Sequence, residues 1–408
     1  MLPNRLILIA AVVAACATVL PAEDKKPVAP AGDFKPMFNG KNLDGWVNVN
    51  CAPDTFYVKG DEIITTGSPT GFLRTDRQYE NFVMEFDWMH VEKEKMANSG
   101  LFVWGDPLPA VGTAYTRGIE VQVLINFAPK DGWATSHGDI FSIWGARCTP
   151  DRPHFKGIER CLPSENRVKG GGEWNHYKVT GNDGAIKLEV NGKEVSGVSK
   201  CNPRKGYLAL ESEGAECHFK NLKIKELPST NPKPEEVAKV WEGHTSLFNG
   251  IALKGWKTEK DAWKVSGGVI RPTTKEVTAK ETLETEKKYG KAELVFDWKM
   301  PAKGEGGFCG VDLGSFAVDM NAFGGSLVGW RDGDKFEGTR RGKDVDLKPG
   351  QWNRTVITVD GKKYSVTVNG KDAGAWEEKE RAEGPVRFRP TAGLEIMNVF
   401  VRELKPKE

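Results

Sequence analysis

The chain has 408 residues, of which 28% are charged and 39% hydrophobic, and its formal net charge is +2. This length suits two domains of ordinary size, each able to bury a core of its own. A nearly neutral chain lacks the basic surface on which nucleic-acid binding depends, so we expect no nucleic-acid partner.

The first residues have the pattern of an export signal. Arg5 precedes an apolar run over residues 6–15, which is too short to span a membrane because a spanning helix takes about 20 residues. We therefore expect a signal peptide over residues 1–22. Two cleavage points remain open, after Ala17 or after Ala22.

Residues 13–16 also resemble a bacterial lipobox, in which Cys16 would carry a lipid anchor. No later stretch is apolar enough to be transmembrane. We expect an exported protein, periplasmic or secreted, with lipoprotein processing at Cys16 as the alternative.

The rest of the sequence repeats itself. The motif at Phe38–Trp46 returns at Phe248–Trp256, and Phe86-Asp87-Trp88 returns as Phe296-Asp297-Trp298, both displaced by 210 positions. Further along, the displacement falls to 178, as shown by the pairs Trp174/Trp352 and Asn191/Asn369. The chain thus holds two copies of one fold, and the second copy lacks 32 residues between the counterparts of Trp88 and Trp174.

The repeat and the proline content set the expected boundaries. We expect a first domain over residues 33–228, a proline-rich linker over residues 229–242 and a second, degenerate domain over residues 243–405.

Both copies have the pattern of an all-β protein. Apolar and polar residues alternate over 84–88, 186–190 and 364–368, with the period of two that is typical of half-buried strands, and large apolar residues recur with the same period over 294–298. Two of these runs lead into Asn191-Gly192 and Asn369-Gly370, and Asn-Gly favours a tight hairpin because both turn residues tolerate positive φ. Short strands separated by glycine-rich turns predict a two-sheet sandwich or jelly roll in each copy.

One strand of the first copy carries candidate catalytic groups. In residues 118–123, Ile119, Val121 and Val123 point to one face, and Glu120 and Gln122 to the other. A glutamate beside a glutamine can supply a base with a hydrogen-bonding partner. The alternative is ordinary polar decoration of a strand.

Other polar and aromatic residues of the first copy complete the candidate site. His137 could act as a base or metal ligand with Asp139 beside it, although a loop histidine is commonly structural. The candidates for substrate binding are Asn98, Arg74, Arg117, Trp104 and Trp144.

The second copy tests these candidates. Ala317 and Asp319 stand where the first copy has Glu120 and Gln122, and no histidine follows Trp256. The framework persists while the polar set is lost, which favours a functional role for that set in the first copy.

Six cysteines follow Cys16, and export permits disulfides. Cys148 and Cys161 flank one loop, and Cys51 and Cys201 could join an early loop to a late one. We expect these two pairs, although a sequence by itself does not fix connectivity.

Several motifs together resemble the 3-keto-disaccharide hydrolase domain family, also described as 3-keto-glucoside 1,2-lyase/hydratase. They are the motif at 38–46, Asn98-Ser99-Gly100 with Phe102, Glu120-Val121-Gln122, residues 172–175, and Phe219-Lys220-Asn221 with Ile224. The resemblance covers nearly all of copy one and the framework of copy two. It implies two concanavalin A-like jelly-roll β-sandwich domains in tandem and a carbohydrate substrate oxidised at C3.

Such a substrate allows cleavage by elimination. A ketone at C3 acidifies the C2 proton, a base removes it, and the C1–oxygen bond breaks before water adds back. Glu120 or His137 could be the base. Arg117, Gln122, Asn98 or a divalent metal ion could hold the enediolate. Because the sequence offers only one convincing acid, direct hydrolysis by paired carboxylates is disfavoured.

Two other readings remain open. The chain could be a non-catalytic, lectin-like tandem protein that binds carbohydrate, or a structural protein of the cell envelope. Loss of the polar set in only one copy favours the enzyme.

Overall fold

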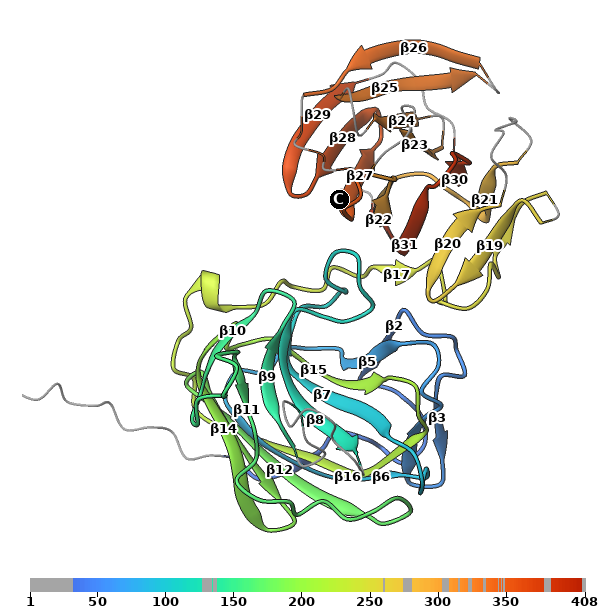
Figure 1. Cartoon of the computed structure of the whole chain (residues 1–408). Coiled ribbons are helices and arrows are strands. Elements are labelled where there is room, and N and C mark those ends of the chain that lie inside the picture. The colour runs from blue at the N-terminus through green and yellow to red at the C-terminus, as the bar shows by residue number, and fades with distance from the viewer. Residues whose placement is uncertain are drawn as a thin grey trace, which may run out of the picture.

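The computed structural model describes residues 32–126, 134, 138–259, 261–273, 281–302, 308–314, 316–321, 325–332, 335–343, 345, 347, 349–377 and 383–405. The expected signal peptide, Cys16 and His137 lie outside these residues. Figure 1 shows two β-sandwiches stacked on one another, and we call them domain 1 (strands between Lys35 and Glu226) and domain 2 (strands between Thr245 and Glu403).

Sheet 1A of domain 1 is antiparallel. Its strands in spatial order are β10 (Arg147–Pro150), β14 (Lys193–Asn202), β13 (Ala185–Val190), β12 (Asn175–Asn182), β6 (Phe82–His90), β16 (Cys217–Glu226), β4 (Glu62–Thr65) and β3 (Phe56–Lys59), with β1 (Lys35–Pro36) paired to β16.

Sheet 1B packs against it. Its strands in spatial order are β11 (Arg160–Cys161), β9 (Ile140–Ile143), β8 (Gly118–Ile125), β7 (Ala97–Gly105), β15 (Tyr207–Ser212), β5 (Gly71–Thr75) and β2 (Trp46–Val49). A 3₁₀ turn, η1 (Pro234–Glu236), lies between the domains in sequence.

Domain 2 repeats this plan. Sheet 2A runs β19 (Trp263–Ser266), β20 (Val269–Pro272), β31 (Glu395–Glu403), β22 (Ala292–Lys299), β27 (Asn353–Asp360), β28 (Lys363–Val368) and β29 (Lys371–Glu377), with β17 (Thr245–Ser246) paired to β31. Sheet 2B runs β18 (Trp256–Lys257), β21 (Leu283–Tyr289), β30 (Gly384–Arg389), β23 (Phe308–Leu313), β24 (Phe316–Asn321), β25 (Gly325–Asp332) and β26 (Lys335–Arg341).

The local patterns predicted from the sequence are confirmed. On β6, Met84, Phe86 and Trp88 are fully buried between the sheets. Asn191 and Gly192 have φ of 47° and 86° and join β13 to β14, and Asn369-Gly370 does the same between β28 and β29. Each domain has its own apolar core, so the all-β class and the tandem sandwich are established. Within the described residues, no helix is long and apolar enough to span a bilayer.

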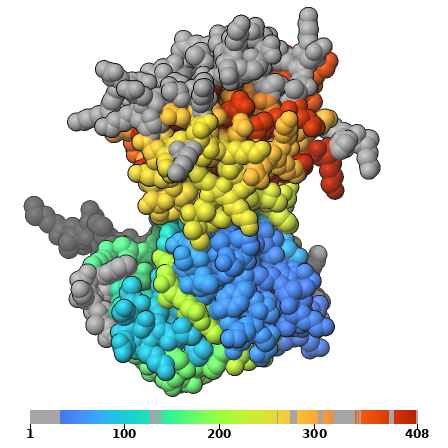
Figure 2. All heavy atoms as spheres, turned by 90° about the vertical axis from the view of Figure 1, so that its right-hand side faces the viewer, coloured from blue at the N-terminus to red at the C-terminus, as the bar shows by residue number. Residues whose placement is uncertain are grey.

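The two domains share a packed seam. Val295 and Phe400 on sheet 2A pack against the outer face of sheet 1B, where they form one buried cluster with Val49, Phe72, Phe102 and Ala209. Figure 2 shows the first residues of domain 2, in yellow, seated directly on the N-terminal part of domain 1, in blue. This contact is more extensive than the proline-rich linker suggested.

A hairpin loop of domain 1 forms the polar half of the seam. We call residues 107–116, between β7 and β8, the seam hairpin. Arg354 donates a hydrogen bond to Pro109 O (2.8 Å), the Gly112 amide donates to Asp297 Oδ2 (2.9 Å), and Asn398 donates to Thr113 O (2.8 Å). The seam hairpin lies in the stretch of domain 1 to which the shorter second copy has no counterpart.

The expected disulfides are absent from this structure. Cys51, Cys148, Cys161 and Cys201 are all buried free thiols. Cys51 follows β2 at one edge of the sandwich, whereas Cys201 lies on β14 beside β10 at the opposite edge. Cys148 and Cys161 share the core, but their thiols contact the carbonyl groups of Glu159 and Leu162 instead of each other. The pairing predicted from the sequence is therefore wrong here, because loop position does not fix which thiols face one another.

Candidate active site

Sheet 1B places residues from distant parts of the chain in rows across its outer face. Glu120 pairs with Phe102 on β7 and with Phe141 on β9, and Phe141 pairs in turn with Arg160 on β11. In the neighbouring row Gly100 pairs with Gln122. The predicted shared face of Glu120 and Gln122 is thus confirmed, and both side chains are buried.

Two glutamates meet over a glycine in this face. A Cβ atom placed on Gly100 would lie 2.8 Å from Oε2 of Glu211 and 3.0 Å from Oε1 of Glu120, so the two carboxyl oxygens lie within about 6 Å of each other. Only glycine leaves this gap free. Glu211, on β15, therefore joins Glu120 as a second acid, which the sequence did not reveal.

Burial changes the protonation of both acids. Desolvation, followed by the negative charge of Glu213, raises the pKa of Glu120 to about 8, although Arg160 acts in the opposite direction. Desolvation and the facing carboxylates of Glu120 and Glu213 raise the pKa of Glu211 well above its usual value. Neither oxygen of the fully buried Glu211 side chain accepts a hydrogen bond from the described residues. Glu120 can therefore exchange a proton near pH 8, while Glu211 is held in its protonated form.

Glu213 is the third acid of the cluster, and it is hydrogen-bonded. Tyr115 on the seam hairpin donates its hydroxyl to Glu213 Oε1 (2.6 Å), and Asn98 donates its amide to Oε2. Gln122 in turn donates to Oδ1 of Asn98 (2.6 Å). These bonds orient the carboxylate and fix the amide groups beside it.

A cation closes the other side of the face. Arg160, with 8% of its side chain exposed, donates to Oδ2 of the fully buried Asp139 at 2.7 Å, and its guanidinium lies 3.9 Å from the centre of the Phe141 ring. The predicted Asp139 is therefore placed to orient Arg160, because its carboxylate is held in this ion pair.

An aromatic pair forms the wall of the site. The ring of Trp144, half of it exposed, stacks on Tyr115 with centroids 6.2 Å apart and planes 10° from parallel. Flat exposed aromatic faces suit the apolar faces of sugar rings. Trp144 thus lies against Tyr115, whose hydroxyl group binds Glu213.

Two other predicted residues, Trp104 and Arg74, lie elsewhere. Trp104 has φ of 56° at a bulge in β7, which turns its ring into the core, where it is fully buried. Arg74 is buried between the rings of Tyr207 and Trp241 and donates to Pro107 O, so it supports the seam. Trp104 and Arg74 therefore do not reach a substrate on this face.

Arg117 closes the base of the seam hairpin. Its Nε donates to Oδ2 of Asp106 at 2.9 Å. The cation that acts on Glu120 is instead Arg160, which lowers the pKa of that carboxyl. In the part of the chain that the structure describes, no three His, Cys, Asp or Glu side chains are arranged to hold a metal ion.

The residues missed from the sequence share a cause. Glu211 and Glu213 continue the alternation of β15, in which Leu208 and Leu210 are core residues. Because side chains alternate along a strand, Glu211 and Glu213 must point to the outer face, but only the strand pairing shows that β15 lies beside β7.

Domain 2 keeps the strand pairing of sheet 1B but not the residues Glu120 and Glu211. Gly310 pairs with Asp319, and Asp312 with Ala317, so Ala317 and Asp319 occupy the positions of Glu120 and Gln122, as predicted. The counterpart of Glu211 is Arg389, whose Nε would lie 2.5 Å from a Cβ placed on Gly310. An arginine thus stands in place of Glu211 and an alanine in place of Glu120, so domain 2 does not repeat this pair of acids.

Comparison with solved structures finds several remotely similar chains. A putative glycosyl hydrolase from Parabacteroides distasonis is 22% identical over 48% of this chain and 94% of its own, with a TM-score of 0.36. A carbohydrate-binding module from Bacillus subtilis is 14% identical over 45% of this chain and 96% of its own, with a TM-score of 0.32. A galectin from Caenorhabditis elegans is 13% identical over 38% of this chain and 100% of its own, with a TM-score of 0.27.

No curated protein matches the chain. The sequence profile of the 3-keto-alpha-glucoside-1,2-lyase-like domain, by contrast, matches residues 33–225 and again residues 243–405, which together make up most of the chain. The two matches fall on the two sandwiches, so this carbohydrate-active protein belongs to the 3-keto-alpha-glucoside-1,2-lyase-like domain family.

Proposed function

We propose that domain 1 cleaves glycosides whose sugar carries a ketone at C3, and that domain 2 is not catalytic. The observation that carries this proposal is the pair of buried carboxyl groups, Glu120 and Glu211, facing each other across Gly100 with raised pKa values. Elimination next to a ketone needs one base and one proton donor, and this pair supplies both.

Each group takes one step of the reaction. Ionised Glu120 removes the C2 proton, and the electron pair moves into an enediolate across C2 and C3. The C1–oxygen bond then breaks, and Glu211 gives its proton to the leaving oxygen. Water adds across the resulting C1–C2 double bond, so that the net change is hydrolysis of the glycoside.

The remaining residues stabilise charge and shape. Arg160 acts on the charge of Glu120, and we assign it the role of balancing negative charge on the substrate. Trp144 stacked on Tyr115 offers a flat surface for the sugar ring. Glu120 is preferred to His137, the alternative base, because the pKa of Glu120 is about 8.

The two-acid arrangement also revises the sequence-based argument against paired carboxylates. An acid pair about 5–5.5 Å apart is the arrangement of retaining glycosidases, which cleave unmodified glycosides. The deciding experiment is to incubate the purified protein with a 3-keto-glucoside and with the matching unoxidised glucoside, and to follow both by mass spectrometry.

Cleavage of the 3-keto compound alone, with exchange of the C2 proton for deuterium in heavy water, is the expected result. Cleavage of both compounds at similar rates would favour direct hydrolysis by the Glu120–Glu211 pair. Binding of saccharides without turnover of either compound would favour the lectin-like alternative.

A further inference from the structure

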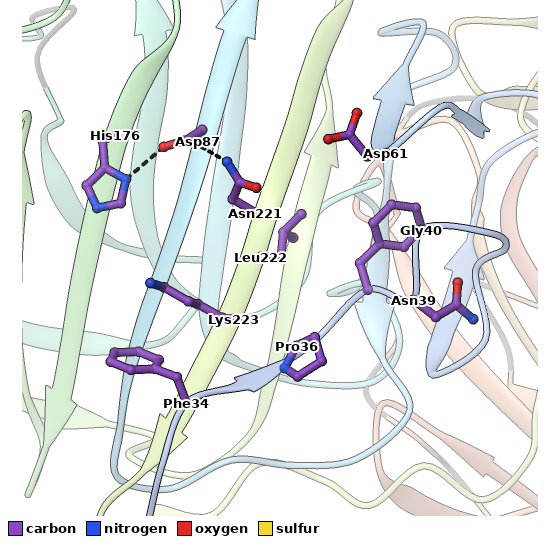
Figure 3. Close-up of a pocket in the computed structure, with 11 residues that line it drawn as sticks. Phe34, Pro36, Asn39, Gly40, Asp61, Asp87, His176, Asn221, Leu222 and Lys223 are labelled. Carbon is purple, nitrogen blue, oxygen red and sulfur yellow. Dashed lines mark hydrogen bonds and ion pairs between the residues drawn. The ribbon is translucent and has the colours of Figure 1, made fainter.

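A pocket on the outer face of sheet 1A in domain 1 has the same arrangement of residues as the surface with which domain 2 binds the seam hairpin. Asp87, His176 and Asn221 line a hollow of ≈ 600 Å³ on the outer face of sheet 1A, together with Asn39 and Gly40 (Figure 3). His176 Nδ1 lies 2.7 Å from Oδ1 of Asp87, and Asn221 donates to Oδ2 of the same carboxylate (2.6 Å).

Strand register gives each of these residues a counterpart in domain 2. Asp87 pairs with His176 between β6 and β12, and Asp297 pairs with Arg354 between β22 and β27. The bulge asparagines match as well, because Asn221 has φ of 55° and Asn398 has φ of 52°, each at the register shift of the strand paired with β6 or β22.

In domain 2 the same three positions hold a polypeptide turn. Arg354 and Asn398 bind Asp297, and all three also bind backbone groups of the seam hairpin. Gly112 lies at the tip with φ of 73°, so close to the Trp352 ring that a Cβ atom there would collide with it. Gly250, the counterpart of Gly40, also contacts domain 1, at Pro69.

Burial differs between the two sets. The Asp297 side chain is fully buried and that of Arg354 is 16% exposed, whereas the side chains of Asp87 and His176 are 21% and 44% exposed. Asn398 is fully buried and Asn221 is exposed. Domain 1 thus presents the hydrogen-bonding set of an occupied site in an open form.

We propose that this pocket of domain 1 binds a glycine-tipped hairpin loop of a separate protein, in the way that domain 2 binds the seam hairpin. A second copy of this chain fits less well, because its seam hairpin is already held by its own domain 2. Domain 2 has no equivalent hairpin to offer, since only two residues separate β23 from β24 in the sequence.

The flanks of the pocket indicate a reversible contact. In domain 2 this position is apolar, because the apolar cluster of the seam includes Val295 and Phe400 and packs against Val356. The counterparts in domain 1 are charged: they are Glu85, Lys223 and Lys178. Lys223 and Glu85 form an ion pair at 2.8 Å. A partner would therefore meet a charged rim around the backbone-binding set, which favours exchange over permanent packing.

The test uses the full chain and a cyclic peptide with the sequence of residues 106–117, whose ends are adjacent because Arg117 and Asp106 form an ion pair. Titration calorimetry should show that the wild-type chain binds this peptide. The affinity of the Asp87→Asn and Asn221→Ala variants for the peptide should be at least 10-fold lower than that of the wild type. The variant His176→Arg, which copies Arg354, should bind more tightly. A peptide carrying Gly112→Val should not bind.

Four results would overturn the proposal. The first is that neither the wild type nor His176→Arg binds the peptide, and the second is that Asp87→Asn and Asn221→Ala bind it as tightly as the wild type does. The third is that only Arg354→Ala loses binding. The fourth is that the chain associates with itself and that Asp87→Asn abolishes this association. The last would identify a second copy as the occupant. Thermal melting of each variant confirms that a loss of binding is not a loss of folding.

Discussion

Glu120 and Glu211 come from strands that are not adjacent, yet their carboxyl groups meet across Gly100 of the strand between them. Both groups are buried, and a third glutamate, Glu213, raises the pKa of each. Like charges in a desolvated site keep at least one proton among them, which gives the site a base and an acid at once.

Replacing the base should stop turnover without unfolding the protein. Glu120→Gln keeps the shape of the side chain and removes its ability to accept a proton, so turnover of a 3-keto-glycoside should fall by about 10²–10⁴-fold. Steady-state kinetics measure this fall. Glu189→Gln, which changes a half-buried ion pair with Lys178 on sheet 1A, is the matched control and should retain full activity.

The rate should follow ionisation of Glu120. Because the base must be ionised and its pKa is about 8, kcat/KM should rise about tenfold per pH unit below pH 8 and level off above it. Measuring kcat/KM from pH 5.5 to pH 9.5 tests this expected rise and plateau. A flat profile across that range would assign the proton abstraction to another group.

The same buried acid should lower stability as the pH rises. Below the ordinary pKa of 4.5 the carboxyl is neutral in both the folded and the unfolded chain, so it carries no penalty. Between 4.5 and about 8 only the unfolded chain ionises, and the free energy of unfolding falls by up to about 1.4 kcal/mol per pH unit. The melting temperature of Glu120→Gln should therefore equal that of the wild type near pH 4.5 and exceed it increasingly towards pH 8.

Filling the gap between the acids should separate them. In Gly100→Ala the new methyl group would meet the ends of the Glu120 and Glu211 side chains, which can swing aside, so we expect folding to persist. Turnover should fall at least tenfold because the carboxyl groups no longer face one site. Circular dichroism checks the fold, and unchanged kinetics would show that the pair does not act together.

Domain 2 should support the site through the seam hairpin. Arg354→Ala removes the bond to Pro109 O and leaves the buried Asp297 without its ion-pair partner, which is expected to destabilise the protein by about 3–5 kcal/mol. Amide hydrogen exchange over residues 107–116 should accelerate, and activity should fall because Tyr115 on this hairpin holds Glu213.

The control for that variant is Arg77→Ala, which breaks an ion pair with Glu226 that is about half exposed and makes no contact with Asp297 or Arg354. Exposed pairs contribute little, so its stability and its hydrogen exchange over residues 107–116 should match those of the wild type. Equal exchange in Arg354→Ala and the wild type would show that domain 2 does not hold the hairpin.

The sequence by itself determined the repeat, the strands and the shared face of Glu120 and Gln122. These features depend on neighbours along the chain: side chains alternate between the faces of a strand, and Asn-Gly accepts the positive φ of a tight turn. Loss of the polar set from the second copy was equally visible, since Ala317 and Asp319 could be aligned without coordinates.

Only the tertiary structure decided what meets at that face. Glu211 and Arg160 reach it because β15 and β11 belong to the same sheet as β8, and no local pattern specifies that order. A bulge turned Trp104 into the core, and packing of Trp241 buried Arg74. Strand order, bulges and the covering of one face by another domain depend on which arrangement buries the most apolar surface while satisfying its polar groups, and that is a property of the whole chain.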